Sequence, residues 1–248
     1  MSDDARNDIA EGQGASSVPA DEPGGDGMDI HKARPWHGWR EFLKEIATIV
    51  CGIVIAIALE QVVEQLHWRH EVAVARRALA AEISRNDRVF AFRVAAAPCI
   101  ARRLSAIELL AERTARHEPV LAVESVMPDT GDALRDNVWQ AHRASQTLTH
   151  FDDDTLALLS AYYQQLGYSN LGMTQEGESQ AALSLLESDP SRLAPSDISA
   201  IRIGVQRARA VGTILAAIAR EELETSKRLN ITAPSADAAR LAFVCRQI

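Results

Sequence analysis

The longest apolar run of the chain lies near its N-terminus. Fourteen apolar or small residues follow one another from Ile46 to Leu59, in the stretch EIATIVCGIVIAIALEQ. As a helix this run is about 21 Å long, which is shorter than the roughly 30 Å hydrocarbon layer of a membrane. Extension to Leu43 and Val63 gives 21 residues, or about 31 Å, and leaves the charged residues close to the ends, where their side chains reach water. The pattern therefore predicts a membrane-spanning helix.

The tryptophans support this interpretation. Three of the four tryptophans, Trp36, Trp39 and Trp68, bracket the apolar run. Trp39 and Trp68 are 29 residues apart, which is about 43 Å of helix and matches the roughly 40–45 Å thickness of a bilayer with its headgroup layers. Because tryptophan concentrates at both surfaces of a membrane, we expect these three residues to be membrane-interface anchors.

A second interpretation of the same run is a signal peptide. Residues 56–58 form the A-x-A pattern of a cleavage site at its end. However, the acidic leader is too long for a signal peptide and the helical pattern continues through the cleavage site, so we favour the span. Basic residues place the N-terminus in the cytoplasm by a small margin, because four precede the run and three follow it closely. They are Lys32, Arg34, Arg40 and Lys44 before the run, and Arg69, Arg76 and Arg77 after it.

Apolar residues continue at helical spacing beyond the span. They recur three, four or seven residues apart from Val72 to Val94, and again from Ile100 to Leu110. One helix is therefore expected to leave the membrane and continue as a long helix. Pro98 is expected to kink or end it. Residues 117–131, which contain two prolines and a glycine, are expected to form a loop.

The second half of the chain also has helical patterns. A helical block is expected to begin near Asp132, and a further helix should start at an N-cap on Asp152 or Asp153 and run to Glu187. The stretch SDPSRLAPSD then interrupts the helical pattern. Ser196 is expected to cap the last long helix.

That last long helix has a clean heptad seam, and the small residues in the seam predict a close approach to a neighbouring helix. The seam consists of Ile198, Ile201, Val205, Ala208, Gly212, Leu215 and Ala219. The helix is expected to end at residues 230–234, and a short helix should follow at 235–246. No strand pattern occurs, so the expected fold is all-α: a single transmembrane helix that continues into a long helix of an antiparallel helical bundle.

Composition separates an N-terminal tail from the rest. Residues 1–29 contain eight acidic residues and one arginine, a formal charge of −7, whereas the whole chain has −8. The tail has few large apolar residues and is expected to be disordered. We therefore expect a disordered acidic N-terminal tail (1–35), a transmembrane helix with interfacial flanks (36–68) and a helical-bundle domain (69–248). Without a basic stripe and interleaved aromatics, nucleic acid is not an expected partner.

Two cysteines in the expected domain, Cys99 and Cys245, are a candidate disulfide, which an oxidising compartment would permit. Two unrelated buried thiols are the alternative. Cys51 lies inside the expected span. In the same segment, Gly52 and Ala56 are spaced for helix packing in a membrane, or the glycine simply faces lipid.

Candidate catalytic and metal-binding residues are sparse. Glu64 and His67 have the Glu-x-x-His spacing of di-iron bundles, but no second copy occurs, so a polar collar at the membrane surface is the simpler interpretation. His150 precedes three aspartates that an acidic helix start explains. Charged residues near Trp139 are expected to form a solvated face around a core tryptophan; they are Asp132, Arg135, Asp136 and His142. No nucleotide-binding, hydrolase or metalloprotease motif is present, so no metal and no cofactor is expected.

Two segments carry a family resemblance. The stretch REFLKEIATIVCGIVIAIALEQVVEQLHWRHEVAVARRALAAEISRN resembles the start of a group of uncharacterised bacterial single-pass inner-membrane proteins, a domain of unknown function. VWQAHRASQTLTHFDDDTLALLSAYYQQLGY is similar to their following block from Trp to Tyr. The resemblance implies a bacterial inner-membrane anchor and a helical extramembrane domain. The basic residues and the cysteine pair then place the N-terminus in the cytoplasm and the C-terminal domain in the periplasm. It implies no activity and no functional residues.

The sequence therefore favours a non-enzymatic, membrane-anchored helical-bundle protein that acts as a scaffold or interaction module of the cell envelope. The alternative is a ligand-binding sensor bundle that signals through a partner by means of its membrane helix. The expected partners are the membrane lipid bilayer and either a second copy of the chain or another protein.

Overall fold

The computed structural model describes residues 38–123, 125–127 and 133–246. The expected acidic tail (1–35) and Trp36 lie outside these described residues. Five α-helices make up most of what is described: α1 (Gly38–Ala115), α2 (Asn137–Ala144), α3 (Asp153–Leu183), α4 (Pro195–Arg228) and α5 (Ala238–Val244). Three short 3-10 helices lie at Thr147–His150, Ser184–Glu187 and Pro190–Arg192. No strand occurs in the described ranges, which confirms the all-α class.

The chain divides into two compact units, which are described separately: residues up to Ile57, and Ala58–Ile248. The described part of the first unit is the beginning of α1. It contributes to an 18-residue apolar window of α1, none of which is buried. The helix is thus long and apolar enough to cross a membrane, as the hydrophobic pattern predicts. Trp39 is 72% exposed, and its ring is tilted by 38° to that of Phe42, with ring centroids 5.9 Å apart.

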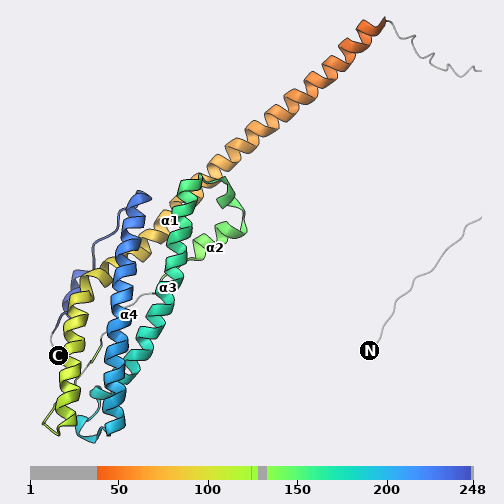
Figure 1. Ribbon diagram of the computed structural model, residues 1–248. Coiled ribbons are helices and arrows are strands. Elements are labelled where there is room, and N and C mark those ends of the chain that lie inside the picture. Colours follow the sequence, from red (N-terminus) through yellow and green to blue (C-terminus); the bar gives the residue numbers. More distant parts are fainter. Residues whose placement is uncertain (1–37, 124, 128–132, 247–248) are drawn as a thin grey trace, which may run out of the picture. The chain divides into compact units, whose positions relative to one another are not determined.

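Within the second unit, α1 does not end at Pro98. The residue lies inside the helix, and Figure 1 shows that α1 bends in the yellow part of its ribbon, which contains this proline. A proline in a helix interior removes one backbone hydrogen bond and its ring displaces the carbonyl four residues earlier, so a bend is the expected consequence. Of the two outcomes that the sequence allows, the structure therefore has the kink.

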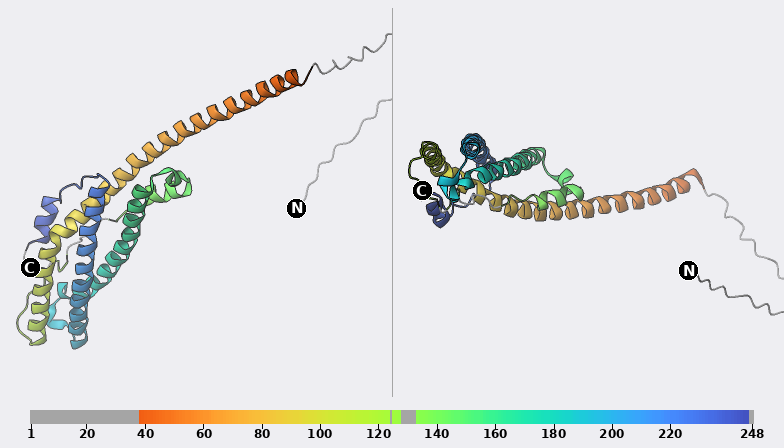
Figure 2. Two further views of the ribbon diagram at one scale, coloured as in Figure 1. Left: turned by 45° about the horizontal axis from the view of Figure 1, so that its top comes forward. Right: turned by 90° about the horizontal axis from the view of Figure 1, so that it is seen from below.

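Helices α1, α3 and α4 lie side by side over the lower part of the second unit, and the same arrangement is visible in both views of Figure 2. α3 and α4 are antiparallel. The Cβ of an alanine at Gly172 would lie 2.8 Å from Leu215 Cδ2, and at Gly204 it would lie 3.2 Å from Ala182 Cβ. Gly204 thus makes room for the backbone of α3, although it is not one of the seam residues. At the seam residue Gly212, a Cβ would meet only Glu176 Oε1, at 3.9 Å.

Apolar side chains of the second unit form two clusters. One packs the later part of α1 against α3, α4 and α5, with Leu104, Ile107 and Ile201 among its fully buried members. The other joins the earlier part of α1 to α2, α3 and α4, with Leu79 and Ile83 fully buried. The polar side chains described below are buried together with residues of this second cluster.

The helix starts agree with the sequence at one position and differ at another. Asp152 is the N-cap of α3, and its side chain accepts a hydrogen bond from the Thr155 N–H at 2.9 Å. The prediction that Ser196 caps α4 is wrong. The helix begins at Pro195, and the Asp197 side chain accepts from the Ala194 N–H at 2.9 Å. Proline is well suited to the first helical position because it has no N–H to satisfy there, so the helix starts earlier than the serine suggests.

Candidate functional site

The second unit buries a group of polar side chains between α1, α2, α3 and α4, which we call the buried polar cluster. Every member is at most 8% exposed. Uncompensated burial of such groups costs several kcal/mol each, so their partners matter. The members are Glu82, Asn86, Asp87 and Arg93 of α1, Tyr162, Tyr163 and Glu176 of α3, and Glu222 and Ser226 of α4.

Glu82 and Asn86 hold the segment that leads into α2. Glu82 accepts hydrogen bonds from the backbone N–H groups of Val138 at 2.9 Å and Trp139 at 3.3 Å. Because the first N–H groups of a helix have no partner within it, this carboxyl group of α1 caps α2 from outside. One turn later, Asn86 forms two hydrogen bonds with the Arg135 backbone, accepting from its N–H at 2.9 Å and donating to its carbonyl at 2.8 Å.

Two aromatic side chains complete this end of the cluster. Trp139 and Tyr163 are stacked, with ring centroids 4.7 Å apart and an interplanar angle of 8°. The Tyr163 hydroxyl donates to Glu82 at 2.8 Å. Burial, reinforced by that hydrogen bond and the nearby charge of Glu82, raises the pKa of Tyr163 well above its ordinary value. The phenol therefore stays protonated and acts as a donor.

A buried ion pair joins α1 and α3 further along. Arg93 Nη1 and Nη2 donate to Glu176 Oε1 and Oε2, each at 2.7 Å, and the two side chains are 5% and 4% exposed. Two parallel hydrogen bonds between a guanidinium and a carboxylate are among the stronger polar contacts in proteins. They balance both charges in the core.

Asp87 and Glu222 have no such ion pair. Asp87 Oδ1 accepts from the Tyr162 hydroxyl at 3.2 Å and from the Ser226 hydroxyl at 3.0 Å, so one oxygen links all three long helices. Desolvation by burial raises the pKa of Asp87 to about 6, although the hydrogen bonds from Ser226 and Tyr162 act in the opposite direction.

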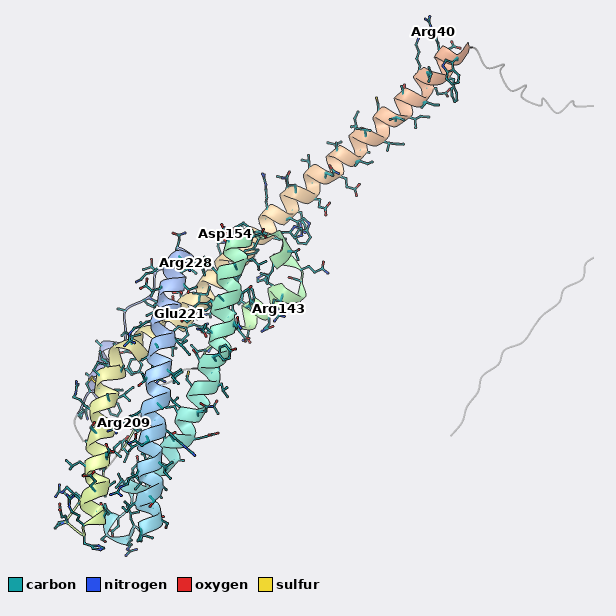
Figure 3. All side chains as sticks on the ribbon, viewed as in Figure 1. Arg40, Arg143, Asp154, Arg209, Glu221 and Arg228 are labelled. Carbon is teal, nitrogen blue, oxygen red and sulfur yellow. A yellow bond between two sulfur atoms is a disulfide. The ribbon has the colours of Figure 1, made fainter. Side chains whose placement is uncertain are left out.

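Glu222 lies one turn before Ser226 on α4 and is 1% exposed. Burial is the main cause that raises its pKa to about 8, and the charges of Glu221 and Asp87 add to it. Burial and the charges of Asp87 and Glu222 likewise raise the pKa of Tyr162 far above its ordinary value. Figure 3 shows Glu221 on α4, the neighbour whose charge contributes to this effect.

The two cysteines meet at the bend of α1. Cys99 directly follows Pro98 and forms a disulfide with Cys245 at the end of α5, with a Cα–Cα distance of 4.9 Å. Nearby, Arg103 donates to the backbone carbonyls of Ser125, Val126 and Arg246. Together these contacts attach the C-terminal segment to the middle of α1. Cys51 is exposed and not bonded.

Of the other residues singled out by the sequence, Trp68 contacts both Glu64 and His150, whereas Gly52 and Ala56 are exposed. Gly52 is exposed, and a Cβ there would meet nothing within 4 Å. Ala56 is also exposed. Trp68 stacks on His150 with ring centroids 3.7 Å apart, and its indole N–H donates to Glu64 at 3.4 Å.

The aspartates after His150 have other roles. Asp152 caps α3 and pairs with Arg76 at 2.5 Å. Its pKa is lowered, mainly by the hydrogen bonds with Thr155. In the described part of the chain, no three His, Cys, Asp or Glu side chains are grouped so that they could hold a metal ion.

One cleft of the second unit combines cationic and apolar walls. It has a volume of about 440 Å³ and lies between α1, the start of α3 and the end of α4. Arg76, Arg77 and Arg228 line it together with buried Leu79 and Ile83. Figure 3 shows Arg228 and Asp154, another lining residue, at the same end of the unit.

Comparison with protein-family models, curated proteins and solved structures finds no match for this chain. The resemblance to bacterial single-pass membrane proteins therefore stays a prediction. The two segments that carry it nevertheless meet in the buried polar cluster. Glu82 and Asn86 come from the first segment, and Trp139, Tyr162 and Tyr163 come from the second.

Proposed function

We propose that this protein is a membrane-anchored helical-bundle protein that acts as a non-enzymatic scaffold or interaction module of the bacterial cell envelope. The main support is the apolar window of α1, none of which is buried. Large apolar side chains point outward on all sides of this part of the helix, at 40–66% exposure, and such a surface is stable only in contact with lipid or another apolar surface. They are Leu43, Ile46, Ile49, Val50, Ile53, Val54, Ile55, Ile57, Leu59, Val62, Val63 and Leu66.

Two further observations support the location. Trp39 is 72% exposed near the beginning of the helix, where an interfacial tryptophan would contact headgroups. The disulfide between Cys99 and Cys245 favours an oxidising compartment for the second unit, such as the periplasm, because cytosolic thiols are kept reduced. The small excess of basic residues before the span agrees with a cytoplasmic N-terminus.

A role without catalysis is supported by the inaccessibility of the polar residues. The members of the buried polar cluster are at most 8% exposed, and their hydrogen bonds join helices to one another. Of these members, Arg93 lines a cleft of about 390 Å³, and it is paired there with Glu176. The cluster therefore suits a structural or conformational role better than a chemical one.

The alternative sensor function expects a ligand pocket between Trp139, Tyr163 and the last long helix, α4. These two rings are stacked at 4.7 Å and are 7% and 8% exposed, so they fill that space themselves. This packing argues against a ligand at that position.

Fractionation of cells that produce the full chain tests the anchor. We expect the protein to stay in the membrane fraction after washes with high salt or alkaline carbonate and to be released by detergent. Release without detergent would overturn the proposal. Reporter fusions at both ends then determine the orientation, and a reporter active only in the periplasm should function at the C-terminus alone.

A pair of substitutions makes this test specific. Ile53→Arg places a charge at the centre of the apolar window, where insertion costs about 2.5–3.5 kcal/mol per charge. Ile214→Arg changes an equally exposed isoleucine on α4, since the two residues are 54% and 59% exposed. Only Ile53→Arg should weaken membrane attachment. Equal behaviour of the two variants would contradict an anchoring role for the apolar window.

A further inference from the structure

Three buried polar atoms of the described chain have no hydrogen-bond partner: Asp87 Oδ2, Ser169 Oγ and Glu222 Oε2. They come from three different helices, α1, α3 and α4. Asp87 is 0% exposed, Ser169 2% and Glu222 1%. Buried polar atoms are nearly always satisfied in native proteins, so these orphan atoms require an explanation. Asp87 and Glu222 lie close enough for their charges to interact.

Asp87 and Glu222 lie among acidic and hydroxyl groups. The groups that act on them are Tyr162 on α3, and Glu221 and Ser226 on α4. The nearby cation of the cluster, Arg93, forms its two 2.7 Å hydrogen bonds with Glu176. Two adjacent carboxylates without a cation are unfavourable in a low-dielectric interior, and binding of a proton relieves both their repulsion and the cost of burial.

We propose that Asp87 and Glu222 form a proton-binding site between α1 and α4, in which a proton held on the Glu222 carboxyl group keeps the end of α4 packed against α1. When this proton leaves to solvent, the carboxylate that remains has no donor at Oε2. It must then be hydrated, which requires the last turns of α4 to move away from α1. The site goes beyond the proposed anchoring function and does not depend on it.

The direction of the pH effect follows from the folded and unfolded states. Burial raises the pKa of Glu222 from its ordinary 4.5 to about 8. Between these values the folded protein holds a proton that the unfolded chain has lost. Stability from this group is therefore complete below pH 4.5 and is lost as the pH rises to about 8. Asp87, with its pKa raised to about 6, adds the same trend over a lower pH range.

Infrared spectroscopy of the full chain in detergent micelles tests the protonation directly. Protonated carboxyl groups have a C=O stretching band that carboxylates lack. We expect such a band at neutral pH, with loss at a midpoint of about pH 8, and we expect Glu222→Gln to abolish it. Glu224→Gln is the matched control. Glu224 follows Glu222 by two residues on α4, but it is 67% exposed and pairs with Lys227.

Thermal unfolding of the same proteins tests the consequence. From about pH 6 to about pH 8 the melting temperature of the unaltered chain should fall by about 5–10 °C, as expected for one group that titrates in a domain of this size. Glu222→Gln should remove most of this fall, and Asp87→Asn should lower the midpoint of the band because one repelling charge is gone. Glu224→Gln should behave like the unaltered chain.

Two results would overturn the proposal. The absence of a protonated carboxyl band at neutral pH would show that both groups are ionised and hydrated by buried water. Stabilisation at alkaline pH by added Na⁺ or Ca²⁺, lost in Glu222→Gln, would show that a metal cation and not a proton balances the pair.

Discussion

The buried ion pair between Arg93 and Glu176 gives the sharpest test of how the second unit is held together. Glu176→Ala removes the carboxylate from a pair whose side chains are 5% and 4% exposed. The guanidinium then stays in the core without the carboxylate that balances its charge. Loss of one partner of a buried pair typically costs about 3–5 kcal/mol.

For a unit of about 190 residues, 1 kcal/mol corresponds to about 2–4 °C in melting temperature. Glu176→Ala is therefore expected to lower the melting temperature by about 6–20 °C. The measurement is thermal unfolding of the full chain in detergent, with Trp36, Trp39 and Trp68 replaced by phenylalanine. The fluorescence of Trp139 then reports the tertiary packing at its stack with Tyr163. The exposed pair of Glu224 and Lys227 is the control, and Lys227→Ala should change stability by less than about 1 kcal/mol.

A double replacement separates the pair from its individual charges. Arg93→Met combined with Glu176→Leu removes both charges and keeps most of the volume, so it should cost much less than Glu176→Ala alone. The reasoning is refuted if Glu176→Ala costs less than about 1 kcal/mol, or if the double variant is as unstable as the sum of the single changes.

Further predictions concern packing, the disulfide and the attachment of α2. Gly172→Ala should destabilise by about 1–3 kcal/mol, because its Cβ would lie 2.8 Å from a leucine of α4, whereas Gly177→Ala, which meets nothing, should stabilise α3 by about 0.5–1 kcal/mol. Denaturant unfolding compares the two, and equal effects would contradict the close approach of α3 and α4. Cys99→Ala should lower stability by about 2–5 kcal/mol, since the bond to Cys245 links residues 146 apart in the chain. A reductant should lower the melting temperature of the unaltered chain and leave that of the variant unchanged. Glu82→Ala should speed hydrogen exchange of the Val138 and Trp139 amides at the start of α2, because the Glu82 carboxylate accepts hydrogen bonds from both. Unchanged exchange there would show that α2 is held by its apolar contacts alone.

The helices of this chain were predictable because their apolar positions recur at helical spacing over long segments. α3 and α4 follow the expected pattern, and Asp152 is the N-cap because an aspartate just before an apolar helix satisfies its free N–H groups. The start of α4 was less predictable. Ser196 is a good capping residue by type, but Pro195 fits the first helical position and Asp197 reaches back to the N–H of the preceding residue.

Part of the buried polar cluster could have been predicted from the heptad seam of α4. The seam of α4 alternates steps of three and four residues, and its continuation beyond Ala219 falls on Glu222 and Ser226. Both are buried. Polar residues at seam positions are therefore the signal, because they mark places where a core must pair or neutralise polar groups. Which groups pair with them depends on other helices, and no single helix contains that information.

The polar cluster also explains how three helices with many small residues keep one alignment. The middle of the α4 seam, Val205, Ala208 and Gly212, offers few distinguishing shapes, so this part of it packs almost equally well after a shift of one turn, about 5.4 Å. The polar pairs do not tolerate such a shift. Arg93 would lose both 2.7 Å bonds to Glu176, and Asp87 would lose the hydroxyl of Ser226 at 3.0 Å.

Each lost contact would leave a buried charge or a buried acceptor unpaired, at a cost that the apolar contacts cannot recover. We infer that the cluster fixes the alignment of α1 with α3 and α4, and that the incomplete pairing of Asp87 and Glu222 leaves one part of this alignment dependent on a proton. A chain in which Asp87, Glu222 and Ser226 are replaced together by apolar residues of similar size should keep its helix content and gain stability at alkaline pH. If a chain in which Arg93 and Glu176 are also replaced by apolar residues keeps a single alignment, as judged by NMR contacts between Phe90 and Tyr162 and between Gly172 and Leu215, then the apolar seams alone determine the alignment and this inference is wrong.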